Sequence, residues 1–389
     1  MNEAENLPQA LVDRSIVWWR NLRISLFNNT IMFGIFFLFV AFHSQFHNYY
    51  SYEGVPDTVL LARTLYHIPN ISKTFPELFN TPYYFAQYQY YPIYLRIFIK
   101  ICFFDSWLAV PLSTFFQNIL STFSFFYMLS SFNVVYNYFL SSYVFITFPL
   151  TFILQKNLAL PTSLCFSFEC LAFAFLKQKK ILFVSIFCLL ATLISFQGII
   201  VTLSILSYFI IKKKLIRFLI LFLISLLTIP SYMFLGNIMY GDKDACFKAI
   251  FLKFSNVPFS AFYQIGEKRP FYLLFGTFLS FLLPSILGTI RLYSIATPLF
   301  IYCLFSLFFI VYINVVDFEK YFIGLSAFAV IIGFDDAISF VLKIIRNPIL
   351  LLFIEIVIYF ISSGLLHYHL MPYEYSEYSM NIQYPFIDF

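Results

Sequence analysis

Long, continuously apolar segments recur along this 389-residue chain and constrain its fold more than any other feature. Several approach 20 residues, as in 25–46 and 349–366. In a helix, ~20 apolar residues span the ~30 Å hydrocarbon core of a bilayer, and every backbone polar group is satisfied within the segment. The runs do not alternate as barrel strands do. With a mean hydropathy of +0.83, they predict an all-α polytopic membrane protein and exclude a soluble globular domain.

Short basic loops set the predicted orientation. Residues 177–180 (KQKK), 212–217 (KKKLIR) and 343–346 (KIIR) are rich in Lys and Arg, as cytosolic loops are. Two long polar loops, about 47–106 and 237–269, then fall on the opposite, lumenal side. The net charge of +5 is spread over loops, so it indicates membrane topology and not nucleic-acid binding.

The expected spans follow from this orientation. Residues 181–211 carry basic loops at both ends, so we expect two short spans that meet near 195–198. Residues 91–104, with Arg96 and Lys100, suit an interfacial helix on the lumenal face. We therefore expect one membrane-embedded domain over 1–389 with about eleven transmembrane helices. The other spans are expected near 25–46, 107–130, 134–154, 158–176, 218–236, 271–290, 295–316, 321–340 and 349–366.

Cysteine usage predicts free thiols. The six cysteines lie mostly inside apolar runs, at no metal-ligand spacing and with no disulfide framework, which predicts buried thiols. They are Cys102, Cys165, Cys170, Cys188, Cys246 and Cys303.

Polar residues concentrate in the two lumenal loops. The spans are nearly free of charge, with Glu169 and Glu355 as the main exceptions. An ionisable group inside a membrane is a functional candidate by default, and a cap or a contact with an aqueous cavity is an equal alternative. Channels place polarity along their spans, and many transporters place it at the midplane. Polarity centred on the loops favours an enzyme that acts at the lumenal interface on a lipid-linked substrate.

Asp57 is the leading candidate for catalysis, and Glu53 is the second. Asp57 follows the first span by about ten residues, where a carboxylate can act as general base at the membrane surface. The alternative is a solvated loop acid. A departing lipid phosphate needs cationic partners, although basic residues near a bilayer also simply anchor to headgroups. The candidate phosphate ligands are Arg63, His67, Arg96, Lys268 and Arg269.

The segment GDKDAC (241–246) spaces Asp242 and Asp244 as a DxD pair, which could chelate a divalent metal with a nucleotide-sugar. A polyprenyl-phosphate donor carries one phosphate and does not need that metal bridge. We therefore interpret the segment as an exposed charged turn, and expect neither a metal nor a cofactor.

Five segments, in order along nearly the whole chain, resemble one enzyme family. They are Pro56-Asp57, YYFAQYQYYP (83–92), LATLISFQGII (190–200), NVPFSAFYQIGEKRPFYLL (256–274) and GLLHYHLMPY (364–373). Together they resemble the second mannosyltransferase of GPI-anchor assembly (the PIG-V type), in the GT-C class of polytopic glycosyltransferases. Pro56 stands where that family has Trp, Phe85 where it has an acid, and the Arg of its Arg-Ser-Asn-Gly stretch has no counterpart.

The resemblance implies a GT-C-like, multi-pass protein of the endoplasmic reticulum membrane. It implies transfer of mannose, the second, α-1,6-linked one, from dolichyl-phosphate-mannose to a GPI-precursor lipid. The mechanism would be inverting, with Asp57 as the base, and a small accessory membrane subunit is a further potential partner. Besides the basic residues above, the implied substrate-binding residues are Gln87, Asn256, Tyr263 and His367.

Two related readings stay open. PYYFAQYQYYP (82–92) fits every fixed position of a motif in the first GPI mannosyltransferase (the PIG-M type), and INVVDFEKYF (313–322) resembles another part of that family. Its DxD in the first loop is absent here. A non-catalytic polytopic subunit of the GPI transamidase also shares Pro-x-Thr near 149–151.

Overall fold

The computed structural model describes residues 89–103, 106–132, 161–254, 257–258, 282–312, 328–329 and 332–333. About 86% of the described residues are helical and none of them lies in a strand, which confirms the all-α class. The elements are α5 (Tyr91–Ile101), α6 (Ser106–Phe132), α9 (Thr162–Lys177), α10 (Ile181–Ile194), η3 (Phe196–Gly198), α11 (Ile199–Ile211), α12 (Leu215–Leu226), α13 (Thr228–Tyr240), α14 (Ala245–Phe251), α17 (Leu282–Ile295) and α18 (Thr297–Tyr312).

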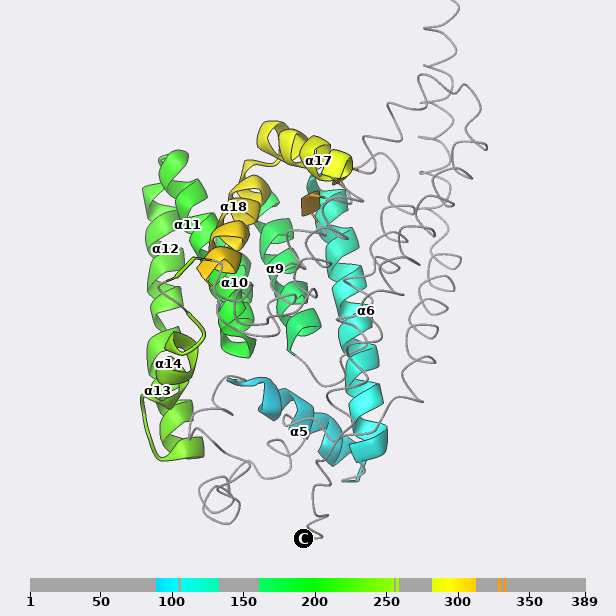
Figure 1. The fold of residues 1–389 in the computed structure, drawn as a ribbon, viewed down its shortest axis with the longest axis vertical. Coiled ribbons are helices and arrows are strands. Elements are labelled where there is room, and N and C mark those ends of the chain that lie inside the picture. Colours follow the sequence, from blue (N-terminus) through cyan, green and yellow to red (C-terminus); the bar gives the residue numbers. More distant parts are fainter. Residues whose placement is uncertain are drawn as a thin grey trace, which may run out of the picture.

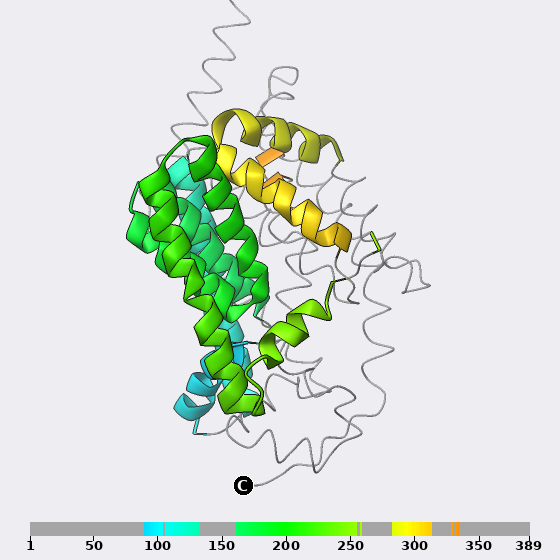
Figure 2. The ribbon, with the colours of Figure 1, turned by 90° about the vertical axis from the view of Figure 1, so that its left-hand side faces the viewer.

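The helices form a bundle with two distinct ends. α9 packs between α6 and α10, and α11 packs on α18. Figure 1 shows α5 lying across one end of the bundle and α17 across the other. In the side view of Figure 2, α14 leaves the foot of α13 at an angle. We call the end that holds α5 the α5 end, and the end that holds the loops after α9 and α11 the basic end.

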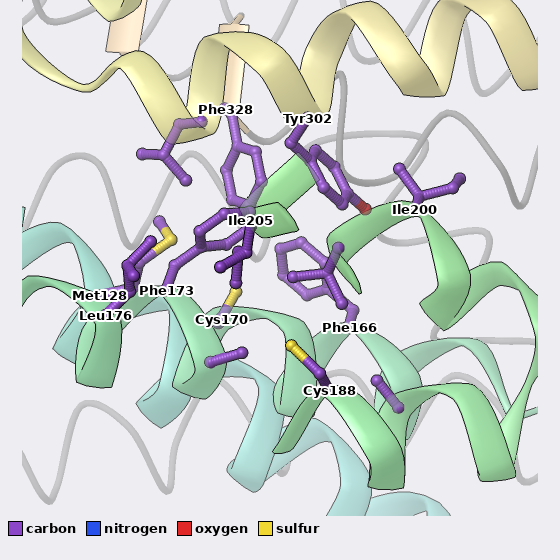
Figure 3. Packing of buried hydrophobic residues seen from close by; sticks show 14 of the residues in the cluster. Met128, Phe166, Cys170, Phe173, Leu176, Cys188, Ile200, Ile205, Tyr302 and Phe328 are labelled. Carbon is purple, nitrogen blue, oxygen red and sulfur yellow. The ribbon is translucent and has the colours of Figure 1, made fainter. Parts of the chain in front are cut away.

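Buried aromatic rings join helices that are distant in sequence. Phe173 of α9 lies edge-on to Tyr302 of α18, with ring centroids 5.5 Å apart, and edge-on to Phe328 at 6.0 Å. Phe328 also stacks on Phe125 of α6 at 6.3 Å. Figure 3 shows Tyr302 and Phe328 side by side next to Phe173. Such pairs add ~0.5–1.5 kcal/mol beyond the burial of their area.

The two short helices predicted for residues 181–211 are present. α10 ends at Ile194, Ser195 adopts an extended backbone, and η3 leads directly into α11. A Cβ added to Gly198 would lie 2.2 Å from the carbonyl carbon of Ala191, so the return of the chain onto α10 requires glycine. At ~1.5 Å per residue, α10 and α11 are each about 20 Å long, which is shorter than a ~30 Å hydrocarbon core.

The two basic loops on either side of this hairpin lie close together. Burial lowers the pKa of Lys214 below its usual value, and the positive charges of Arg217, Lys179 and Lys212 lower it further. Lys179 follows α9, whereas Lys212 and Lys214 follow α11. The electrostatic contact therefore brings both loops to the same end of the bundle, as the sequence led us to expect.

The interfacial helix expected at 91–104 corresponds to α5. Its buried residues include Tyr91, Leu95 and Ile99 at helical spacing, and its exposed residues include Lys100 and Ile101. This division between the faces is the pattern of an amphipathic helix.

The predicted membrane spans lie partly within the described residues. Leu215–Met239, which comprises α12 and most of α13, is the one stretch among the described residues that is long and apolar enough to cross a membrane. Only 17% of its most apolar window is buried. The helices α6, α9, α17 and α18 overlap the spans expected at 107–130, 158–176, 271–290 and 295–316. The spans expected at 25–46, 134–154 and 349–366 lie outside the described residues, as does most of 321–340.

Candidate functional site

The described ends of both predicted lumenal loops meet at the tip of the α10–α11 hairpin. In the first loop, the backbone amide of Tyr90 donates to the Leu193 carbonyl at 3.2 Å. The side-chain hydroxyl of Tyr90 donates to the Ser231 carbonyl at 2.7 Å. Burial raises the pKa of Tyr90, with a further contribution from Cys246, so the phenol stays protonated and can donate. We call this meeting point the junction; it comprises Tyr90, Leu193, Phe196, Tyr232, Cys246 and Lys253.

The second loop reaches the junction through α14. Cys246 and Ala249 of α14 pack with Tyr232 of α13 in a small apolar cluster that Tyr90 and Leu193 also contact. The hydroxyl of Tyr232 donates to the carbonyl of Thr192, at the end of α10. The junction is therefore built from two loops, the hairpin and α13.

Lys253 places a positive charge in the junction. Its side chain is only 7% exposed, and its Nζ lies 5.0 Å from the centroid of the Phe196 ring. Such cation–π contacts are stronger when the cation is removed from water. Phe254 then packs edge-on against the same ring at 5.9 Å. A lysine forms strong charge-assisted hydrogen bonds with phosphate, so Lys253 is a candidate phosphate ligand.

Two buried amide side chains, on α6 and just before α5, have unsatisfied hydrogen-bonding atoms. Gln89 is 1% exposed and Asn118 is 3% exposed, and the amide nitrogen and oxygen of both have no hydrogen-bond partner. Each buried unsatisfied group costs ~1–3 kcal/mol. Gln89 also has a left-handed backbone, with φ of 42°. Such strain commonly marks functional positions.

α5 is held against α6 by specific polar contacts beside these amides. Gln117 donates from Nε2 to the Tyr91 hydroxyl at 2.8 Å, and the Tyr94 hydroxyl donates to the Ser113 carbonyl at 3.1 Å. Burial raises the pKa of Tyr94 well above its usual value. The Tyr94 phenol thus remains neutral, and the two contacts fix the orientation of α5.

A separate polar cluster lies within the bundle, around Glu169 of α9. Glu169 is 1% exposed, and its Oε2 accepts a hydrogen bond from the Tyr302 hydroxyl at 2.6 Å. The Cys165 thiol lies 3.9 Å from its Oε1. The carboxyl group is therefore enclosed between α9 and α18 and bonded to Tyr302, which argues against a contact with an aqueous cavity.

The acidic turn at 241–246 is structural. Asp242 Oδ2 lies 2.7 Å from Lys248 Nζ, and its Oδ1 accepts from the Asp244 amide at 2.9 Å. The partly exposed pair closes the turn that precedes α14, and Gly241 supplies the left-handed residue after α13 with φ of 66°. The interpretation as a charged turn agrees with this geometry. Among the described residues, no group of three His, Cys, Asp or Glu is placed to hold a metal.

The structure places one of the sequence-predicted site residues. Arg96 lies on α5, half-buried, at the α5 end of the bundle. The other candidates lie outside the described residues: Glu53, Asp57, Arg63, His67, Gln87, Asn256, Tyr263, Lys268, Arg269 and His367.

Lys253, Gln89 and Asn118 are site candidates that the sequence does not reveal. Lys253 stands in a mixed polar segment, and Gln89 is one of several polar residues among tyrosines. Of the three, only Asn118 has a local sequence feature that could have indicated it, because Gln117 and Asn118 form an adjacent amide pair in the middle of an apolar helix.

Comparisons with protein-family models, with curated proteins and with solved structures give no match.

Proposed function

We propose that this protein is a multi-pass glycosyltransferase of the endoplasmic reticulum membrane that transfers mannose from dolichyl-phosphate-mannose to a GPI-anchor precursor. The observation that carries the proposal is the junction, where the ends of two polar loops meet a break between helices. Polar groups gathered at one end of an apolar bundle suit a reaction on lipid-borne substrates. The order of the five sequence segments, from Pro56-Asp57 to 364–373, favours addition of the second mannose.

A membrane location is supported by the outer surface of α12 and α13. Apolar side chains that are at least 40% exposed recur along this helix pair: Leu215, Ile216, Leu219, Phe222, Leu223, Leu226, Leu227, Ile229, Phe234 and Ile238. A contiguous apolar surface of this extent requires lipid or a partner to cover it. The basic loops and the junction lie at opposite ends of the hairpin. This arrangement agrees with basic loops in the cytosol and an active site on the lumenal side.

The proposed chemistry draws its base from the first loop and its cations from both loops. Asp57 takes the proton from the acceptor hydroxyl, which then attacks the anomeric carbon of mannose through a transition state with oxocarbenium character. The bond to the phosphate oxygen breaks, and the dolichyl phosphate leaves with inversion at that carbon. We assign Lys253 of the junction and Arg96 of α5 to offset the charge that develops on the phosphate.

Complementation of cells arrested at single steps of GPI assembly tests the proposal. We expect the chain to restore growth when the second mannose addition is missing, with loss of the accumulated one-mannose intermediate by mass spectrometry of the lipids. Rescue at the first mannose step would instead identify the first mannosyltransferase. Rescue of a strain that lacks the polytopic transamidase subunit would identify a non-catalytic role.

Asp57→Asn separates catalysis from assembly. We expect transfer to fall at least ~100-fold, the range for loss of a general base, while the protein still accumulates in the membrane. Glu53→Gln tests the second candidate, and a loss of this size in Glu53→Gln but not in Asp57→Asn would assign the base to Glu53. Transfer at the wild-type rate by Asp57→Asn would remove Asp57 from the mechanism.

A further inference from the structure

The basic end gathers seven cations without a matching negative charge. Five of the side chains are exposed and two are half-buried, and segments 177–180 and 212–217 contain no Asp or Glu. Within the part of the chain that the structure describes, none of the seven forms an ion pair. They are Lys177, Lys179, Lys180, Lys212, Lys213, Lys214 and Arg217. Like charges held together repel one another, so an anion that binds among them is favoured.

The cations of the two loops form one surface. Lys214 has its pKa lowered by burial first, and then by the positive charges of Arg217, Lys179 and Lys212. Lys179 belongs to the loop after α9, and the other three belong to the segment after α11. Exposed charges interact only over about a Debye length, ~8–10 Å in salt. An anionic group placed between the loops is therefore within reach of cations from both.

Both loops end their helix with the same backbone geometry. Lys179 and Lys213 have left-handed backbones, with φ of 63° and 52°. The residue after each of them donates its amide back to the preceding helix, to the Phe175 carbonyl at 3.1 Å and to the Phe209 carbonyl at 2.8 Å. Glycine is the usual left-handed residue at such a helix end. Lysine at both positions keeps a positive charge where the backbone favours glycine.

Exposed apolar side chains adjoin the cations. Leu182 and Phe183 are exposed in the first turn of α10, and Leu215 and Ile216 are exposed in the first turn of α12. α10 and α12 pack against each other, and each follows one of the basic loops. A charged surface beside an apolar one matches a phospholipid, whose headgroup is joined to acyl chains. A small soluble anion would use only the charged part.

We propose that the basic end binds an anionic phospholipid whose headgroup carries a phosphomonoester, the group present in phosphatidic acid and in phosphorylated inositol lipids. A phosphomonoester carries about −1.5 to −2 charges at pH 7 and three acceptor oxygens, to which lysines of both loops can donate charge-assisted hydrogen bonds. The acyl chains would lie against the apolar side chains of α10 and α12. This site goes beyond sugar transfer and rests only on the proposed membrane location.

Native mass spectrometry of the full chain in detergent micelles tests the site with defined lipids. The probes are phosphatidic acid, phosphatidylinositol, which has a single negative charge, and phosphatidylcholine, which has none. We expect the wild type to bind phosphatidic acid about tenfold more tightly than phosphatidylcholine, with phosphatidylinositol between them. Lys179→Gln and Lys212→Gln, one from each loop, should each weaken binding of phosphatidic acid about fivefold. Neither should alter binding of phosphatidylcholine.

Matched controls come from the opposite end of the bundle. Lys100 and Lys243 are also exposed lysines, and their replacement by glutamine should leave the affinity for phosphatidic acid unchanged. Lys212→Arg keeps the positive charge and should retain the wild-type affinity. Glycerol 3-phosphate has the same phosphomonoester without acyl chains, and it should bind at least about tenfold more weakly than phosphatidic acid.

Heat denaturation gives a second readout with an opposite sign. In phosphatidylcholine nanodiscs, Lys212→Gln removes a charge that repels Lys214, so the variant should have a higher Tm than the wild type. Phosphatidic acid should then raise the Tm of the wild type more than that of the variant. If Lys212 had only a structural role, its variant would have the lower Tm in both lipids, which would contradict the proposal.

The remaining outcomes separate the phospholipid site from its alternatives and from the proposed function. Equal affinity for phosphatidic acid and phosphatidylcholine, or equal losses in the control variants, would overturn the site. Binding of glycerol 3-phosphate as tight as that of phosphatidic acid would overturn a lipid as the ligand, and equal binding of phosphatidylinositol would overturn the phosphomonoester. A preference for phosphatidic acid in a chain that fails complementation would support the site and remove mannosyl transfer.

Discussion

Glu169 keeps a carboxyl group inside the bundle through its bond to Tyr302. We expect Tyr302→Phe to lower the free energy of unfolding by about 1–3 kcal/mol, since it leaves a buried oxygen without its donor. Glu169→Leu leaves the Tyr302 hydroxyl unpaired and should cost a similar amount. The double variant removes both polar groups and should be more stable than the sum of the two losses predicts.

Heat denaturation of the four proteins in nanodiscs measures this coupling. Cys165→Ala is a suitable control, because its thiol lies 3.9 Å from the carboxyl group and should couple weakly. Additive losses for Tyr302→Phe and Glu169→Leu would show that the two side chains do not interact.

Cys246 gives a prediction on pH. Burial raises the pKa of its thiol to about 12, whereas an unfolded cysteine titrates near ~8.5. The folded state therefore disfavours the thiolate, so the stability from this group is complete below the unfolded pKa and is lost as the pH rises toward 12. Relative to Cys246→Ala, the wild type should lose up to ~1.4 kcal/mol per pH unit above that value.

Denaturant unfolding from pH 7 to pH 10 checks this difference. Below pH 8 the difference in free energy of unfolding between the wild type and Cys246→Ala should be constant. Above pH 9 the wild type should lose stability relative to the variant. A constant gap over the whole range would mean that Cys246 is accessible to solvent in the folded protein.

For single residues, the sequence predicts whether a side chain is buried better than it predicts which side chains it contacts. All six cysteines are free and buried, as their positions within apolar runs predicted. The partners of Glu169 could not be predicted, because Tyr302 lies 133 residues away in the sequence. Gln89 and Lys253 were missed for the same reason. Their burial depends on helices that pack around them, and nothing in their local sequence indicates it.

The hairpin is the element that the sequence described most fully. An apolar stretch with basic residues at both ends must return to the side where it began, and α10, η3 and α11 do so. α5 also begins where the sequence predicted, at Tyr91, but it ends at Ile101, before the predicted limit of residue 104. The close approach at the tip of the hairpin was not predictable, because the role of Gly198 depends on the path of α10.

Gly198→Ala tests that approach. Its Cβ would overlap backbone atoms of Ala191 and Thr192, at 2.2 and 2.4 Å, and backbone cannot move aside as a side chain can. We expect Gly198→Ala to lower the free energy of unfolding by about 1–3 kcal/mol or more. The substitution should also displace Phe196 and Lys253 at the junction. Transfer activity should fall with the stability.

Gly241→Asn is the matched control at a second glycine. A Cβ at Gly241 meets nothing within 4 Å, and asparagine tolerates a left-handed backbone. Gly241→Asn should therefore lower the free energy of unfolding by less than ~1 kcal/mol. Heat denaturation compares the two, and equal losses would contradict steric overlap as the cause at Gly198.

For the whole molecule, the arrangement predicts two faces with opposite accessibility. Lys180 and Lys212 are exposed at the basic end, whereas Lys100 and Lys243 are exposed on α5 and beside α14. Single cysteines at these four positions can be labelled in sealed microsomes with a membrane-impermeant maleimide. The wild type supplies the background, because its six thiols are buried and should react slowly.

We expect Lys180→Cys and Lys212→Cys to react from the cytosolic side of intact microsomes, and Lys100→Cys and Lys243→Cys to react only after permeabilisation. The first pair tests the hairpin: a stretch that crossed the membrane once would place these two positions on opposite sides. The second pair tests the junction, because a shared site requires the ends of both loops in one compartment. Labelling of Lys100→Cys and Lys243→Cys from different sides would exclude the proposed active site shared by the two loops, whatever the chemistry assigned to Asp57.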